Sequence, residues 1–260
     1  MMLIRASLFL LIPWMMISCR TAKSVVAAVD VKPTSFLPHA KELKENRKRS
    51  PFLGNWWTTD KKVLTAAEKV KSIYIAPVVS DELRAMTQKF ALMEFSKKRH
   101  ASKVKGLVTY THDRFVKAFK SNKKSRYTVV DAPSKDAMTL KLSIIEWEPN
   151  TVSGLAIREA LDMALPVPFT PIGSLLGKSA RPAIAIQGVL TEPTTGKSFF
   201  EFADKEETRM AVILFFPNEL LPTGQARYAI REWASQFEKL MSTPPDKQIR
   251  DSMPIQLMEF

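Results

Sequence analysis

Apolar residues recur at every third or fourth position in three stretches of the chain, and this spacing predicts three amphipathic helices. The first is expected to begin just after Ser80, and the second covers residues 104–119. The third covers residues 225–241 and is followed by two prolines that cannot continue it. Its apolar stripe, which we expect to be buried, consists of Ala226, Ile230, Trp233, Ala234, Phe237 and Leu240.

Short runs rich in β-branched, aromatic or alternating apolar residues predict five strands. In the stretch from Ala137 to Trp147, apolar and polar residues alternate, which is typical of a half-buried strand with one wet face. Gly196 lies in a polar turn between the last two runs and is free to adopt a positive φ there. The five predicted strands are 72–78, 126–131, 137–147, 182–191 and 198–202.

The order of these elements predicts an α+β fold with a single mixed β-sheet of about five strands and helices packed on one face. The sheet is expected to be mixed because a two-helix connection permits a crossover, whereas the later strands are joined by hairpin-length links. We divide the chain into a signal peptide (1–18), a flexible lipid tether (19–35), an extended arm (36–69), the α+β domain (70–245) and a loose tail (246–260). Trp56 and Trp57 are interpreted as anchors of the arm, with a ligand platform as the alternative.

The first 18 residues have the layout of a secretory signal peptide, with Arg5, an apolar core over residues 8–17 and the small Ser18. The apolar run is too short for a membrane span, which needs about 20 residues. The segment Met16–Cys19 resembles a bacterial lipobox, in which the cysteine is acylated. Cys19 is the only cysteine of the chain, so it cannot form an internal disulfide. We therefore predict lipidation at Cys19; a signal peptide without lipidation is the alternative.

The chain has a formal net charge of +13, concentrated in the runs 41–49, 97–105 and 117–126. A basic surface favours anionic partners. No nucleic-acid-binding motif accompanies the charge, and export would separate the protein from nucleic acid. The expected partners are therefore the membrane, through the N-terminal lipid, and anionic envelope polymers or lipid headgroups. The alternative is that these lysines are ordinary solvated surface.

Residues 151–177 form an apolar, proline-containing segment between two predicted strands. Its prolines and charges exclude a normal membrane span. Such a segment either folds back on the core or forms a surface for a protein partner or the bilayer.

No catalytic motif stands out. The three histidines, His39, His100 and His112, have no metal-ligand spacing, and no phosphate-binding loop or nucleophile elbow is present, so no metal and no cofactor is predicted. Glu146 and Glu148 flank Trp147 on one strand and could serve as an acid–base pair, although strand-end carboxylates are most often solvated.

Several segments together resemble a family of bacterial lipoproteins that is classified only as a domain of unknown function (number 3313). The most specific match is IQGVLTEPTTGKSFFEFADKEE followed by GQARYAIREWASQF. The resemblance covers nearly all of the mature chain and implies a single domain without a known activity. It implies structural roles for Gly196 in the turn, Phe202 in the core, Asp204 as a turn cap and Trp233 in helix packing. The chain departs from the family pattern at Glu192, where an aspartate is usual.

The sequence thus predicts a non-catalytic cell-envelope lipoprotein, a binding or assembly component in the outer membrane that faces the periplasm. The alternative is an envelope hydrolase acting on glycan or lipid through strand-borne carboxylates. A binding protein should show a basic or apolar surface patch, whereas an enzyme should show a cleft with converging titratable groups.

Overall fold

The computed structural model describes residues 31–45, 49–86, 97–149, 183–207 and 223–249. Cys19 and the segment 151–177 lie outside the described residues, so the predictions for them stay predictions. Within the described part, six strands form a single mixed sheet, and three α-helices and one 3-10 helix accompany it. The predicted α+β class is confirmed, with one strand more than expected.

The sheet has the strand order β1-β6-β5-β4-β2-β3. Strand β2 pairs in parallel with both β3 and β4, and the remaining neighbours pair antiparallel, so the sheet is mixed as predicted. The helix α4 between β2 and β3 provides the crossover that parallel neighbours require. The strands are β1 (Gly54–Trp57), β2 (Ser72–Ile75), β3 (Thr128–Val130), β4 (Ala137–Glu148), β5 (Ala183–Thr191) and β6 (Ser198–Glu207).

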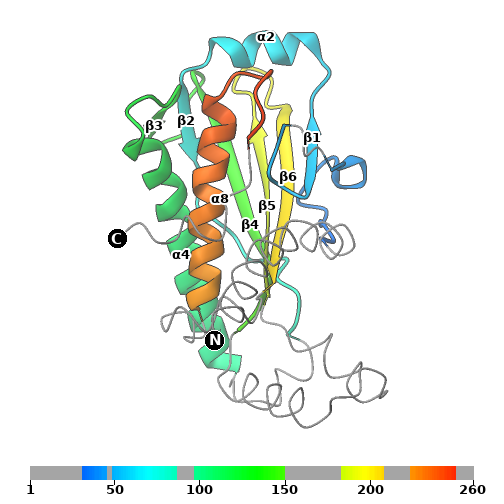
Figure 1. Ribbon diagram of the computed structural model, residues 1–260, viewed down its shortest axis with the longest axis vertical. Coiled ribbons are helices and arrows are strands. Elements are labelled where there is room, and N and C mark those ends of the chain that lie inside the picture. Colours follow the sequence, from blue (N-terminus) through cyan, green and yellow to red (C-terminus); the bar gives the residue numbers. More distant parts are fainter. Residues whose placement is uncertain (1–30, 46–48, 87–96, 150–182, 208–222, 250–260) are drawn as a thin grey trace, which may run out of the picture.

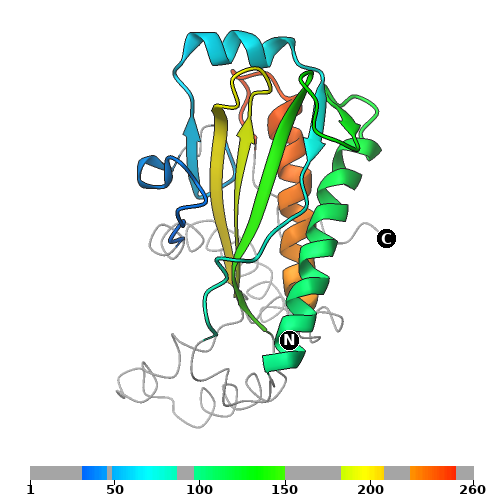
Figure 2. The ribbon, with the colours of Figure 1, turned by 180° about the vertical axis from the view of Figure 1, so that it is seen from behind.

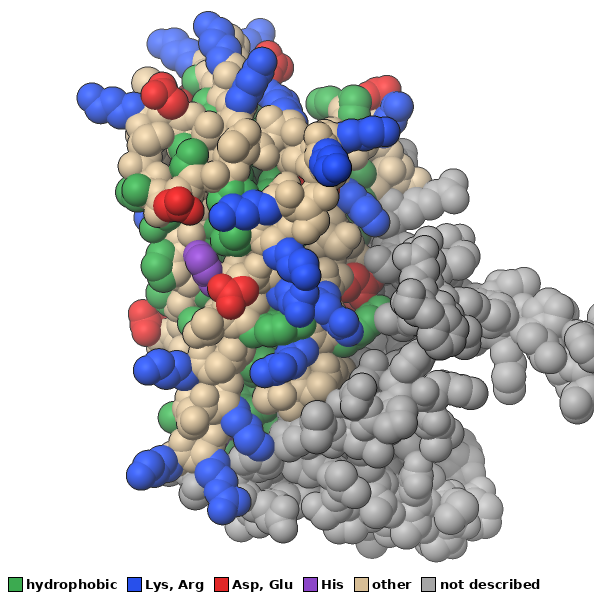
Figure 3. Space-filling view, turned by 90° about the vertical axis from the view of Figure 1, so that its left-hand side faces the viewer, with side chains coloured by type: hydrophobic (Ala, Val, Ile, Leu, Met, Phe, Trp, Pro, Cys, Tyr) green, Lys and Arg blue, Asp and Glu red, His purple; other side chains and the backbone are tan. Residues whose placement is uncertain are grey.

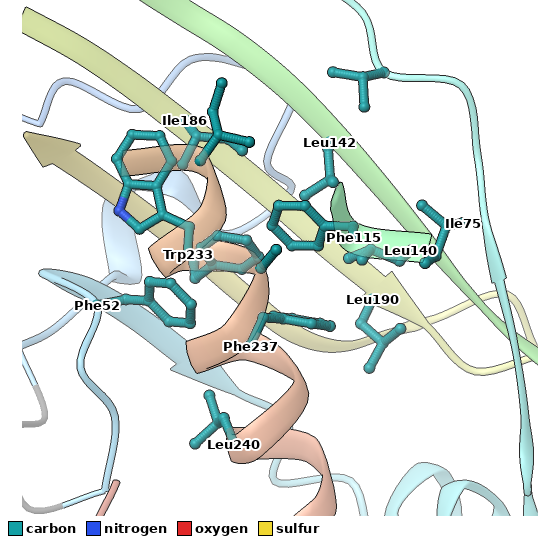
Figure 4. Close-up of a cluster of buried hydrophobic side chains, with 14 of the residues drawn as sticks. Phe52, Ile75, Phe115, Leu140, Leu142, Ile186, Leu190, Trp233, Phe237 and Leu240 are labelled. Atoms are coloured by element: carbon teal, nitrogen blue, oxygen red, sulfur yellow. The ribbon is translucent and has the colours of Figure 1, made fainter. Parts of the chain in front are cut away.

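Two long helices, α4 (Lys97–Ser121) and α8 (Gly224–Ser242), lie side by side on one face of the sheet, as Figures 1 and 2 show from opposite sides. Both were predicted from their apolar stripes. Phe237 of α8 lies at the centre of the core (Figure 4). Its ring centroid lies 5.4 Å from that of Phe202 and 5.8 Å from that of Phe115. Trp233 is only 1% exposed.

On the other face of the sheet, the segment 31–43, which includes the 3-10 helix η1 (Ala40–Glu42), packs over part of β5 and β6 (Figure 2). Leu37 from this segment packs against Val189 of β5 and Ala203 of β6 in a second, smaller core. The chain then doubles back, and Lys44 pairs with Asn55 at the edge of β1. The start of the predicted arm therefore packs on the sheet through these contacts.

The second half of the predicted arm is not extended. It contains strand β1 and helix α2 (Lys61–Lys69), which crosses one end of the sheet in Figure 1. Asp60 caps α2 by accepting a 2.9 Å hydrogen bond from the amide of Lys62. The sequence pattern did not predict this helix, because it buries only Val63 and Ala67. Two positions are too few to form an apolar stripe.

The helix predicted to begin just after Ser80 is absent through Met86, and its remainder lies outside the described residues. The chain instead continues along the edge of β4. The amide of Val79 donates to the carbonyl of Leu142, and the amide of Arg84 donates to that of Ile145. Because these backbone groups are satisfied by β4, they need no helical hydrogen bonds.

Strand β4 also differs from the prediction, because its second face reaches solvent only at Thr139, Lys141 and Glu146. Further along, Ser143 is fully buried and Glu148 is 8% exposed. At the described start of the predicted tail, Ile249 is buried, and its amide donates to the carbonyl of Arg49. Segments distant in sequence cover these positions, which local alternation cannot reveal.

Candidate functional site

The sheet face beneath the segment 31–43 carries a set of buried polar groups. Gln187 of β5 is fully buried; its Nε2 donates to Oγ1 of Thr34 at 2.6 Å, and its Oε1 accepts from the Thr34 amide at 3.0 Å. On β6, the fully buried Glu201 accepts from the backbone amide of His39 at 2.9 Å. These contacts fix the last residues of the predicted tether and the start of the arm to the sheet.

His39 is the histidine that is most firmly positioned. Its Nδ1 lies 2.7 Å from Oε1 of Glu201, and its ring stacks on Trp56 with centroids 3.7 Å apart and planes 5° from parallel. The Trp56 Nε1 in turn donates to Glu42 at 3.0 Å. Trp56 is thus engaged with the arm, in agreement with its interpretation as an anchor.

Trp57 points to the helix side of the sheet and is packed there. Its ring lies 4.1 Å from that of Phe200 and meets Phe199 edge-on at 5.6 Å. The two adjacent tryptophans therefore anchor opposite faces of the sheet, as alternating side chains of a strand must. They do not form a joint platform.

The other two histidines lie elsewhere. The ring of His100 on α4 stacks at 4.9 Å on Trp147, and burial lowers the pKa of His100. The Nε2 of His112 lies 3.2 Å from the carbonyl oxygen of Ile75. The described residues contain no group of three or more His, Cys, Asp or Glu side chains with the geometry to hold a metal ion.

Glu146, the first of the two candidate carboxylates, is held between two cations. Its Oε2 lies 2.6 Å from Nη1 of Arg84, and its Oε1 lies 2.8 Å from Nζ of Lys205. Arg84 also donates to the carbonyl of Lys32, so the network connects β4, β6 and the segment 31–43. Both carboxylate oxygens thus take part in the network that holds the segment in place.

The predicted basic runs divide into structural and exposed cations. Arg49 belongs to the first kind, since its guanidinium donates to four carbonyls at and beyond the end of α8. Arg126 similarly donates to the carbonyls of Ala67 and Glu68 at the end of α2. Cations at helix C-termini satisfy free carbonyls and favour the helix dipole.

The exposed cations follow the outer surface of α4. Lys98, Lys105, Lys117 and Lys120 are all exposed, and none of them forms an ion pair with another described residue. Asp113 is the one acidic residue of this helix. Figure 3 shows this side of the molecule, where Lys and Arg side chains are spread over the surface and acidic ones are few.

Two arginines and a tyrosine meet where α4 and α8 run side by side. The guanidinium carbon of Arg114 lies 4.8 Å from the centroid of the Tyr110 ring, and that of Arg227 lies 4.9 Å from the same centroid. One turn further along α8, Arg231 lies 5.8 Å from the ring centroid of Tyr228. The sequence did not predict this cluster. The four-residue spacing of Tyr110 and Arg114 on α4 is compatible with their contact, but Arg227 belongs to α8, which is distant in sequence.

Comparisons with known proteins yield only weak similarities. No protein-family model matches the chain, and no curated protein matches it. Among solved structures, the chain is similar to a PelC dodecamer from Paraburkholderia phytofirmans, with 10% sequence identity and a TM-score of 0.34 over 65% of this chain and 88% of that chain. A PelC variant from the same organism gives 9% identity, the same TM-score and coverage of 65% and 90%.

A similarity this weak does not indicate what this chain does. The resemblance of the chain to the lipoprotein family stays a prediction. Of the helices that the structure describes, none is both long and apolar enough to span a bilayer.

Proposed function

We propose that this protein is a non-catalytic lipoprotein of the cell envelope, a binding component that presents the outer surface of α4 and α8 to an anionic partner. The observation that carries the proposal is the row of exposed lysines on α4, Lys98, Lys105, Lys117 and Lys120, which have no acidic partner among the described residues. Charges of one sign gathered on one face raise the local concentration of ligands of the opposite sign.

The opposite face of the sheet supports the same assignment. The segment 31–43 packs over part of it, and polar groups hold that segment through Thr34, His39 and Arg84. Since Glu146 is engaged by two cations, this face supplies anchoring rather than acid–base chemistry. The arm thus fixes the point where the proposed lipid tether leaves the domain.

The anchoring part of the proposal is tested by replacing Cys19 with Ala in cells that express the full chain. We expect the protein to move from the membrane fraction to the soluble fraction and to lose incorporation of labelled palmitate. Continued palmitate incorporation or continued membrane association would contradict lipidation at this residue.

The binding part is tested with the full chain carrying the Cys19→Ala substitution, so that acylation does not contribute. We expect it to associate with vesicles containing phosphatidylglycerol more than with pure phosphatidylcholine vesicles, and to lose this preference at high salt. Replacing Lys98, Lys105, Lys117 and Lys120 together with Gln should abolish the preference. If the fourfold variant binds as the parent does, the α4 surface is not the contact.

A further inference from the structure

We infer that Arg114 and Arg227, converging on the ring of Tyr110, form a binding site for a phosphomonoester group. This inference rests on the proposed function and deepens it, because it names a ligand chemistry and a position on the basic helix layer. Its starting point is that two guanidinium groups from different helices lie within 5 Å of one ring centroid, at 4.8 Å and 4.9 Å.

Such a convergence of like charges favours the binding of an anion. The face of the Tyr110 ring attracts each guanidinium, but the two cations repel each other. Neither the Arg114 nor the Arg227 guanidinium forms an ion pair or hydrogen bond with another described side chain, so no carboxylate among the described residues lies between them. Their N–H donors are available to an external acceptor.

The shape of the cluster favours phosphate over a simple charge contact. Each guanidinium presents a planar fork of N–H donors that matches two oxygens of a phosphate. Stacking on an aromatic ring fixes the plane of the fork, which reduces the side-chain entropy lost on binding. The guanidinium carbons are separated by at most the sum of their distances from the ring centroid. Rotation of these side chains toward each other would place both forks on one phosphate.

The charge of the site matches a phosphomonoester. Such a group carries about −1.5 to −2 charges at pH 7, which two arginines neutralise. Arg231, one helical turn from Arg227, adds a third cation on the same side of α8. Tyr110 itself is half-buried and packs against the main core, so the ring is a fixed support for the two arginines.

The same chemistry could come from a soluble phosphomonoester or from a lipid headgroup, and two probes separate these sources. The full chain in neutral detergent is titrated with glycerol 3-phosphate by calorimetry. In a parallel arm, the micelles are doped with phosphatidic acid and binding is followed by the phosphorus NMR signal of the lipid. Binding of both probes indicates a site open to the free group, and binding of phosphatidic acid alone indicates a headgroup site.

Four variants decide whether the arginine pair is the site. The double variant R114Q/R227Q should weaken binding at least about tenfold. The charge-matched control K71Q/K135Q, which removes two exposed cations outside α4 and α8, should weaken it by at most about threefold. R114K/R227K, which keeps the charge but not the fork, should bind far more weakly than the wild type. Y110F, which keeps the ring, should bind as the wild type does, and circular dichroism verifies the fold of each variant.

The outcomes separate this inference from the proposed function. If K71Q/K135Q weakens binding as much as R114Q/R227Q, or if R114K/R227K binds normally, a diffuse basic surface binds the anion, and the specific site is wrong while the proposed function holds. If neither probe binds the wild-type chain, the phosphomonoester site is wrong; if the chain also shows no preference for phosphatidylglycerol vesicles, the proposed function fails with it.

Discussion

The carboxylate of Asp204 accepts a 2.7 Å hydrogen bond from the indole Nε1 of Trp233, and this contact joins strand β6 to helix α8 inside the core. Asp204 is 2% exposed and Trp233 is 1% exposed. The two residues belong to the two motifs that carry the family resemblance. Asp204 is therefore not the turn cap that the resemblance implied; it satisfies the buried donor of the helix that covers the sheet.

Replacing Asp204 with Ala should destabilise the fold by about 1–3 kcal/mol, because it removes the acceptor of a buried N–H group. Asp204→Asn keeps an oxygen that can accept and should cost less. Urea unfolding followed by circular dichroism measures both variants. Equal losses for the two substitutions would show that the negative charge of Asp204, rather than its acceptor oxygen, is what the core requires.

Removing the indole itself should cost more. Trp233→Ala is expected to lower the free energy of unfolding by about 3–5 kcal/mol, the usual range for a fully buried aromatic side chain. Arg231→Ala, on the exposed side of the same helix, should change it by no more than about 0.5 kcal/mol. Similar small effects for both would contradict the packing of α8 described above.

The long elements were predictable because each carries its own periodic pattern. The stripes of α4 and α8, the strands β4 to β6 and the turn at Gly196, which has a φ of 69°, all follow from residues close in sequence. Glu192 also supports that turn, with its carboxylate accepting from the amides of Thr194 and Thr195 at 2.7 Å and 2.8 Å. The carboxylate of Glu192 thus holds this turn in place.

The features that escaped prediction depend on contacts between distant parts of the chain. Helix α2 buries too few residues to show a stripe, and the segment after Ser80 is extended because β4 receives its hydrogen bonds. The candidate phosphate site has the same character, since Tyr110 and Arg227 meet only after α4 and α8 pack side by side. No local rule connects residues that far apart.

Two glycines should respond in opposite directions to substitution by alanine. A Cβ at Gly188 would lie 2.4 Å from the ring of Phe202 and 2.8 Å from the side chain of Leu142, so Gly188→Ala should destabilise by about 1–3 kcal/mol. Gly106 lies in the exposed middle of α4, with nothing within 4 Å of a Cβ, so Gly106→Ala should stabilise by about 0.5–1 kcal/mol. Thermal unfolding of the two variants measures both signs, and a neutral Gly188→Ala would contradict the close approach of β5 and β6.

The turn carboxylate predicts a specific dependence of stability on pH. Burial acts to raise the pKa of Glu192, but the hydrogen bonds from Thr194 and Thr195 outweigh it, so the pKa is lowered. A group with a lowered folded pKa contributes stability above its unfolded pKa, and this contribution is lost as the pH falls through the folded pKa. The stability difference between wild type and Glu192→Gln should therefore be largest near neutral pH and shrink in acid. A difference that stays constant over urea titrations across this range would contradict the assignment.

Arg49 should prove to be a structural residue despite its place in a basic run. Its guanidinium donates to the carbonyls of Leu240, Thr243, Pro244 and Lys247 at 2.7–2.9 Å, which ties the end of α8 to the segment before β1. Arg49→Ala should cost about 1–3 kcal/mol and speed amide exchange in the last turn of α8, because those carbonyls lose a charged donor. Arg49→Lys should restore only part of the loss, since a single ammonium cannot replace a guanidinium fork. The matched control is Lys239→Ala, an exposed cation of the same turn, which should leave both measurements near wild type; if the two alanine variants behave alike, the capping role is wrong.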